Sequence, residues 1–338
     1  MIKLLLCCAP FIIEACSDLE VSPAPFILET KQIKIIEYPN AFNPSIIRWH
    51  GKLLMSFRNI SNPKDSYNSS DIGLAWLDDD FQITGKPQIL YLNKKGTKPY
   101  HRAEDARLIE VAGHLFMIYS DNEDPIITKG GYRVYIIELV EQNGKFIILS
   151  KERLDSFEGV NPNLREKNWT PFNYKENLLL SYSLNPHLVF KPAIGTGECE
   201  TFALSNKSLQ NWTWGELRGG TQALKIGNRY LTFFHTAIHA NSDHSDGKDM
   251  LHYFMGASTF ESEPPFAMTH ISPEPIIGKG FFTGTIYKQY WGSWRGIFPC
   301  GFIFDKTYIY VVYGRQNHEI WVVKLEKREL LDSLIPIH

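Results

Sequence analysis

Cysteine is scarce in this sequence, and its scarcity excludes two classes of protein. Five cysteines occur in 338 residues, and three of them, Cys7, Cys8 and Cys16, lie before residue 17. The two that remain, Cys199 and Cys300, make no disulfide framework, and neither has the C-x-x-C spacing of a structural zinc site. We expect two free buried thiols, with a single bridge between Cys199 and Cys300 as the alternative.

Excess charge of either sign is also missing. The chain has 35 Lys and Arg against 37 Asp and Glu, a formal net charge of −2. Proteins that bind nucleic acid draw much of their affinity from an excess of cations, so this class is set aside. The sequence has no dinucleotide fingerprint, no phosphate-cradling glycine loop and no G-x-S-x-G elbow, and we therefore expect no cofactor.

The N-terminus has the charge and apolar order of a secretory leader. Lys3 precedes an apolar run over residues 4–13, which at about ten residues is too short to span a bilayer. We interpret residues 1–22 as a signal peptide, or as a lipoprotein leader with Cys16 as the lipid acceptor and a point of membrane attachment. Both imply export to the periplasm, the outer surface or the medium. A buried first strand in a cytoplasmic protein is the alternative.

Aromatic residues, by contrast, are abundant. The chain contains 21 Phe, 16 Tyr and 8 Trp, together with 24 Gly and 19 Pro. Aromatic residues favour strands, while glycine and proline favour turns. No long stretch shows the apolar period of a helix, so we expect an all-β protein.

Short β-rich runs recur about every 64 residues, which indicates an internal repeat. They occupy residues 53–58, 115–120, 178–183, 230–235 and 308–313. A polar or glycine-containing cluster stands ten residues before the start of each run, at Asn43, Asp105, Asn168, Gly220 and Phe298. A further strand-like segment follows each run. Such repeats predict one five-bladed β-propeller over residues 30–338, because blades of antiparallel strands bury their faces by stacking around a channel.

The five clusters should meet at the channel, because the innermost strand of each propeller blade lines it. Together they bring the charged residues Glu104, Asp105, Arg107, Glu166, Lys167 and Arg218. Burying these charges is costly unless they pair with one another or with a ligand. Carboxylates beside cations and aromatic rings are typical of a site that cleaves sugar linkages. Turn capping and ion pairing alone are the structural alternative.

These pieces resemble glycoside hydrolase family 130, five-bladed propellers that act on β-mannosides as phosphorylases or hydrolases. The resemblance rests on residues 43–45 and Arg58, residues 104–108, residues 166–172, residues 219–221 with His235, and residues 298–301 with 312–314. It implies an inverting mechanism with Asp105 as general acid. It also implies that Arg58, Arg107, Lys167 and His235 hold sugar hydroxyls, or phosphate where phosphate is used.

The other cluster residues are expected to contact an oligosaccharide or glycan substrate as well: Asn43, Ser45, Asn168, Trp169, Arg218, Gly220, Thr221 and Arg315. If water is the acceptor, Glu104, Glu166 or Glu216 has to act as the base, and the sequence does not choose among them.

Two departures from the family pattern stand out. Residues 180–187 lack the arginine of the phosphate cluster that follows the third-blade lysine in the phosphorylases, so hydrolysis or transfer is expected over phosphorolysis. Asn317 stands where the last blade often has an acidic residue. A binding propeller with weak or no catalysis is the alternative function.

Two other groups of residues were weighed as sites. His235, His239, His244 and His252 run from a strand into a polar loop and do not predict a metal site. Trp212, Trp214, Trp291 and Trp294 are either packing residues or sugar platforms.

Overall fold

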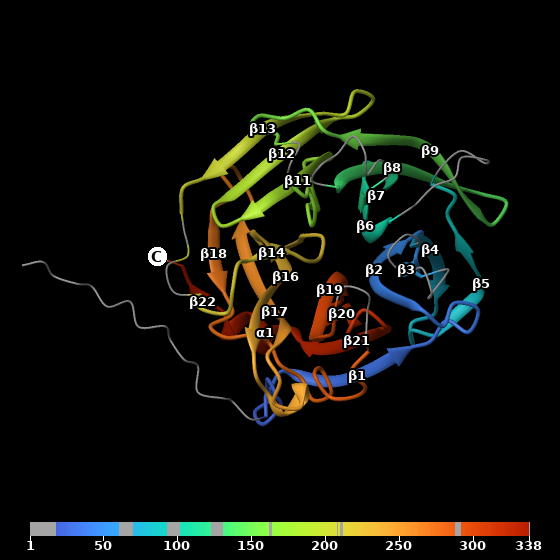
Figure 1. The fold of residues 1–338 in the computed structure, drawn as a ribbon. Coiled ribbons are helices and arrows are strands. Elements are labelled where there is room, and N and C mark those ends of the chain that lie inside the picture. The colour runs from blue at the N-terminus through green and yellow to red at the C-terminus, as the bar shows by residue number, and fades with distance from the viewer. Residues whose placement is uncertain are drawn as a thin grey trace, which may run out of the picture.

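The computed structural model describes residues 18–60, 70–92, 102–122, 131–161, 164–207, 209, 212–287 and 292–337. Its strands form five blades arranged in a ring (Figure 1). Three blades are separate four-stranded sheets, and the other two are joined in one ten-stranded sheet. Strands β2, β6, β14 and β19 lie nearest the centre in this view, and β5, β9 and β13 lie at the rim. The predicted all-β, five-bladed propeller is confirmed.

The first three blades are four-stranded meanders in chain order. Blade one consists of β2 (Ala41–Trp49), β3 (Lys52–Asn59), β4 (Asp71–Leu77) and β5 (Ile83–Ile89). Blade two consists of β6 (Glu104–Val111), β7 (His114–Asp121), β8 (Arg133–Gln142) and β9 (Lys145–Leu154). Blade three consists of β10 (Thr170–Tyr174), β11 (Asn177–Leu184), β12 (His187–Ala193) and β13 (Glu198–Ser205). The β-rich runs of the sequence are the second strands of these blades.

Blades four and five are joined and less regular. Blade four consists of β14 (Arg218–Gly219), β15 (Leu224–Ile226), β16 (Arg229–Ala240), β17 (Met250–Glu261) and β18 (Met268–Ile271). The short strands β14 and β15 both pair with β16, and β22 (Ile335–Pro336) extends β18. The 3₁₀ turn η2 (Asp243–Ser245) joins β16 to β17, and helix α1 (Lys327–Ser333) precedes β22.

Blade five closes the ring with a strand from the other end of the chain. Its own strands are β19 (Trp294–Phe304), β20 (Tyr308–Arg315) and β21 (Glu319–Glu326), and the outer place is taken by β1 (Ile27–Ile33). A parallel pairing of β17 with β19 links this blade to blade four.

The interfaces between neighbouring blades form the core. Five hydrophobic clusters fill them, one for each pair of adjacent blades around the ring. Phe57, Tyr119, Phe233 and Tyr313, all from second strands, are almost completely buried there. Each large apolar side chain buried in this way contributes about 2 kcal/mol. The aromatic richness of the sequence therefore belongs largely to blade packing.

The leader and its boundary stay predictions. Residues 1–17, with Cys7, Cys8 and Cys16, lie outside the described residues, whereas residues 18–22 lie against the propeller. There the Glu20 carboxylate accepts hydrogen bonds from the backbone of Gly280 and Phe282 at 2.7 and 2.6 Å. In the part of the chain that the structure describes, no helix is long and apolar enough to cross a membrane.

The two cysteines of the propeller are separate, buried free thiols. The expectation of free thiols is confirmed, and the single bridge between Cys199 and Cys300 does not form.

Candidate active site

A cavity of about 700 Å³ opens where the inner strands converge. Every blade contributes to its lining, through Asn43 from blade one, Asp105 from blade two, Lys167 from the segment before β10, Arg218 from blade four and Phe298 from blade five. The predicted meeting of the five clusters at one place is therefore confirmed. The cavity is large enough for a small oligosaccharide.

A repeated backbone irregularity aims side chains into this cavity. Register shifts interrupt the pairing of β2 with β3 between Phe42 and Ser45, and that of β6 with β7 between Glu104 and Arg107. Within these bulges, Asn43 and Asp105 have φ angles of 46° and 55°. Asn and Asp tolerate this left-handed conformation better than most residues, which explains their presence there. Such strain is often found at functional sites.

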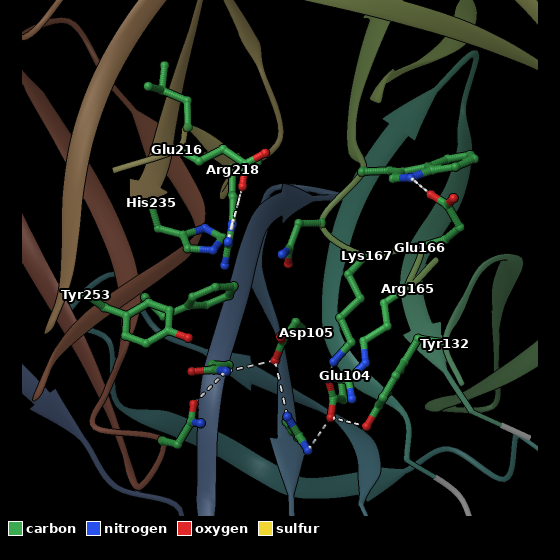
Figure 2. Close-up of a pocket in the computed structure, with 18 of the residues that line it drawn as sticks. Glu104, Asp105, Tyr132, Arg165, Glu166, Lys167, Glu216, Arg218, His235 and Tyr253 are labelled. Carbon is green, nitrogen blue, oxygen red and sulfur yellow. Dashed lines mark hydrogen bonds and ion pairs between the residues drawn. The ribbon is translucent and has the colours of Figure 1, made fainter. Parts of the chain in front are cut away.

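Asp105 lies on the floor of the cavity with one carboxyl oxygen occupied (Figure 2). Its Oδ1 accepts a hydrogen bond of 2.8 Å from Asn43 and lies 3.8 Å from a guanidinium nitrogen of Arg58. Among the described residues, Oδ2 has no hydrogen-bond partner. Asp105 therefore has an oxygen available to a ligand.

Glu104, the adjacent carboxylate, is fully engaged. Its Oε1 accepts hydrogen bonds from Arg58 at 2.9 Å and from the Tyr132 hydroxyl at 2.8 Å, while its Oε2 is paired with Lys167. Burial opposes ionisation, but the charges of Arg58 and Lys167 outweigh it and lower the pKa of Glu104 to about 2. At neutral pH Glu104 is thus an anion that holds two cations in place, and it is a weak base.

Two further carboxylates line other walls of the cavity. Glu166 is 4% exposed, and one hydrogen bond, of 3.3 Å, reaches its Oε2 from the indole of Trp169. Burial raises the pKa of Glu166, partly offset by Trp169 and Arg133. Glu216 is largely exposed and paired with Arg218 at 3.2 Å. Burial therefore makes Glu166 a stronger base than an ordinary glutamate.

An aromatic wall faces Asp105 across the cavity. Tyr253 packs against Trp294 with ring centroids 4.6 Å apart, and its hydroxyl points toward the centre (Figure 2). A side chain at Gly296 would put a Cβ 2.0 Å from the Tyr253 carbonyl, so glycine allows β19 to approach β17 here. Trp294 thus packs against Tyr253 and lines the cavity, and its use as a sugar platform stays a prediction.

His235 completes this wall as a neutral ring. Burial, with the nearby charges of Arg107 and Arg218, lowers the pKa of His235 well below its ordinary value. Its Nδ1 is buried without a hydrogen-bond partner in the described part of the chain. The ring therefore adds no positive charge to the cavity.

Most of the residues predicted from the sequence line the cavity. They are Asn43, Arg58, Glu104, Asp105, Glu166, Lys167, Asn168, Trp169, Arg218 and His235.

Five residues predicted to contact substrate lie outside the lining of the cavity, in the surrounding framework of strands, which we call the frame; their contact with substrate stays a prediction. They are Ser45, Arg107, Gly220, Thr221 and Arg315. Arg107, 1% exposed, donates to the backbone carbonyls of Asp105 and Gly220 at 2.6 and 2.8 Å and so ties blades together. Arg315 is paired with Glu319 at 2.6 Å.

The other three frame residues act through close backbone contacts. The Ser45 hydroxyl accepts from the Leu108 amide at 3.1 Å, and the Thr221 hydroxyl accepts from the Phe233 amide at 3.0 Å. A Cβ at Gly220 would lie 2.4 Å from the Phe233 carbonyl.

The sequence did not identify several lining residues. They are Arg102, Tyr132, Arg165, Tyr182, Ser183, Leu217 and Tyr253. Arg165 and Leu217 adjoin predicted clusters, so proximity was an available signal. Tyr253 is in a third strand, and only the pairing of β17 with β19 reveals its place.

The histidines weighed as metal ligands pair with different partners. His239 pairs with Asp249, His244 with Asp18, and His252 with the Ser242 hydroxyl. Across the described ranges, no three His, Cys, Asp or Glu side chains are grouped to hold a metal ion.

Comparisons with known proteins give one family and one fold. Residues 23–335 match the model of glycoside hydrolase family 130, described as β-1,4-mannooligosaccharide phosphorylase. No protein of curated function matches the sequence significantly.

Solved structures share the fold at low sequence identity. The β-1,2-mannobiose phosphorylase of Listeria innocua superposes with a TM-score of 0.58 at 16% identity, covering 90% of this chain and 92% of that one. A mannose phosphorylase of Leishmania mexicana gives 0.58 at 10% identity, covering 92% of each chain. A family 130 structure whose report describes hydrolases that target β-1,2-mannosidic linkages in Candida mannan gives 0.62 at 15% identity, covering 85% of this chain and 84% of that one.

The family model spans nearly the whole propeller, and the cavity carries the clusters on which the sequence resemblance rests. The chain therefore belongs to glycoside hydrolase family 130, a family of mannoside phosphorylases and hydrolases.

Proposed function

We propose that this protein cleaves β-mannosidic linkages with inversion of configuration, and that Asp105 is the general acid. The observation that supports this assignment is the contrast between two adjacent carboxylates. Both oxygens of Glu104 are held by cations or a hydroxyl, whereas Oδ2 of Asp105 has no partner among the described residues and faces the cavity. A general acid needs an oxygen within reach of the substrate.

Water is the acceptor that we propose, with Glu166 as the base. A base works best when its pKa is near the working pH, and burial moves the pKa of Glu166 in that direction. Glu104 is unsuited because its pKa is about 2. In an inverting hydrolase the base activates a water on the face of the sugar opposite the acid.

Phosphate is the second candidate acceptor, favoured by the cations of one wall. Arg165 lines the cavity without a partner in the described part of the chain, and it points with Lys167 toward Glu104 (Figure 2). Such a group of cations suits an oxyanion. Phosphorolysis would yield α-mannose 1-phosphate in place of mannose.

The test is turnover of β-1,2- and β-1,4-linked mannobiose with and without inorganic phosphate, followed by NMR of the first-formed anomer. We expect mannose of the α configuration without phosphate. Asp105→Asn should lower kcat/KM by about 100-fold or more. Glu110→Gln, an exposed change on the same strand, is the matched control and should not alter it.

Three outcomes would contradict parts of the proposal. Full activity of Asp105→Asn would remove Asp105 as the acid. If turnover required phosphate and Arg165→Ala abolished this phosphate-dependent turnover, phosphate would replace water as the acceptor. Binding of oligosaccharide by calorimetry without any product would favour a sugar-binding propeller.

A further inference from the structure

Two side-chain amides, those of Asn43 and Asn317, are linked by hydrogen bonds to the proposed acid, Asp105. The side-chain nitrogen of Asn43 donates to Asp105 Oδ1 at 2.8 Å and to Asn317 Oδ1 at 3.1 Å. An amide nitrogen carries two hydrogens, so each is used once. The Asn43 amide is therefore fixed as a donor toward Asp105 by its second bond to Asn317.

The same hairpin of blade five also packs against the other end of this amide. Asn43 Oδ1 is seated against Gly314, where a Cβ would lie only 1.9 Å away. Gly314 is in β20, and Asn317 is in the turn that follows it. Blade five thus orients a side chain of blade one, which in turn holds a carboxylate of blade two.

The turn that carries Asn317 is well anchored. Gln316 and Asn317 both have left-handed backbones, with φ of 53° and 49°. The Gln316 amide donates to the Gly296 carbonyl at 3.0 Å, and its side chain accepts from Arg295 at 3.0 Å. Asparagine suits this backbone and supplies the acceptor oxygen as well.

We propose that Asn317 is a positioning residue, which through Asn43 holds Asp105 Oδ1 and so leaves Oδ2 directed at the substrate. Because its side chain is neutral, Asn317 places no negative charge near Asp105, as an aspartate at this position would. This inference rests on the proposed role of Asp105 as general acid.

A charge at position 317 would act on Asp105 together with the charged groups already around that carboxylate. The charged and titratable groups that face it are Arg58 from β3, Glu104 and Arg107 from β6, Lys167 before β10, Arg218 from β14, His235 from β16, Tyr253 from β17 and Cys300 from β19. Glu104 is the one other carboxylate in this group, and cations neutralise it. A carboxylate at position 317 would therefore make Asp105 harder to ionise.

Two variants separate position from charge. Asn317→Gly removes the acceptor while keeping a residue that accepts the left-handed backbone. Asn317→Asp keeps the acceptor and adds the charge. Asn177→Asp, in an exposed hairpin, is the matched control for the same chemical change.

The readout is kcat and kcat/KM against pH, with thermal melting to verify folding. Asn317→Gly should lower kcat by about tenfold with its alkaline limb unmoved, because positioning of the acid is lost. Asn317→Asp should keep most of kcat and move the alkaline limb upward by about one pH unit, since the acid stays protonated longer. Asn177→Asp should match the wild type.

An Asn317→Gly enzyme with wild-type kcat, or an Asn317→Asp profile that superposes on the wild type, would overturn the inference. The variant Asp105→Asn distinguishes failure of the Asn317 inference from failure of the proposed general acid. If that variant is inactive while the position 317 variants behave as wild type, only the role of Asn317 fails. If Asp105→Asn is active, the proposed general acid fails first.

Discussion

Replacing Glu104 by Gln should destabilise the protein by an amount that depends on pH. Glu104 is 8% exposed, and its carboxylate neutralises Arg58 and Lys167. Glutamine has almost the same shape, but its NH₂ group cannot accept from Lys167. Two cations then lose their counter-charge inside the protein, which is a costly arrangement.

The size of the effect follows from the pKa of Glu104. Its fall from an ordinary 4.5 to about 2 corresponds to about 3 kcal/mol of stability. The folded-state pKa is the lower one, so this stability is present above about pH 4.5 and is lost as the pH falls toward 2. The variant, which cannot ionise, should lack this dependence.

Urea unfolding of the wild type and of Glu104→Gln at about pH 7 and about pH 3 measures both statements. The variant should be less stable by about 3 kcal/mol at the higher pH and by clearly less at the lower one. Glu110→Gln, exposed on the same strand, should differ little from the wild type at either pH. A deficit below about 0.5 kcal/mol, or one equal at both pH values, would refute the reasoning.

Three further predictions concern the frame. Arg107→Ala should lower the free energy of unfolding by about 3 kcal/mol, because buried carbonyls of two blades lose their donor; a loss under about 1 kcal/mol in urea unfolding would contradict this. Gly73→Ala should destabilise by about 2 kcal/mol, because its Cβ would lie 2.2 Å from the Phe57 ring, and Phe57→Leu should relieve much of that cost in a double-mutant cycle. Burial lowers the pKa of His187 to about 4, so between pH 6.5 and 4 only the unfolded chain takes up the proton, and the free energy of unfolding should decline as the pH falls through this range. In His187→Gln this decline should be smaller. An unchanged decline would exclude His187 as its source.

The fold was predictable because the repeat is locked in phase. Strand-like runs and the clusters before them keep a separation of ten residues through all five units, and the inner strands of a propeller must converge. Glu104 and Asp105 were found in this way. No feature of a single blade carried this information, since a meander of antiparallel strands occurs in many β folds.

Which cluster residues face the cavity was not predictable. Alternation along a strand has a period of two, and the bulges at Asn43 and Asp105 break that period at the decisive place. Arg107 consequently ties the frame together, although Asp105 and Glu104, two and three residues before it, line the cavity. Tyr253 reaches the site through contacts between β17 and β19, distant in the sequence, which no local pattern records.

The pairing of β1 with β21 has a consequence for the synthesis of the protein. Thr30 pairs with Val323, so the outer strand of blade five is made before blades one to four and its partner after them. Blades one to three need only local contacts and can form while the chain is still growing. During that time β1 is an unpaired strand, exposed to pairing with other chains. Closure of the ring should therefore be the late, slow event of folding. Until it occurs, the chain is most exposed to aggregation through β1.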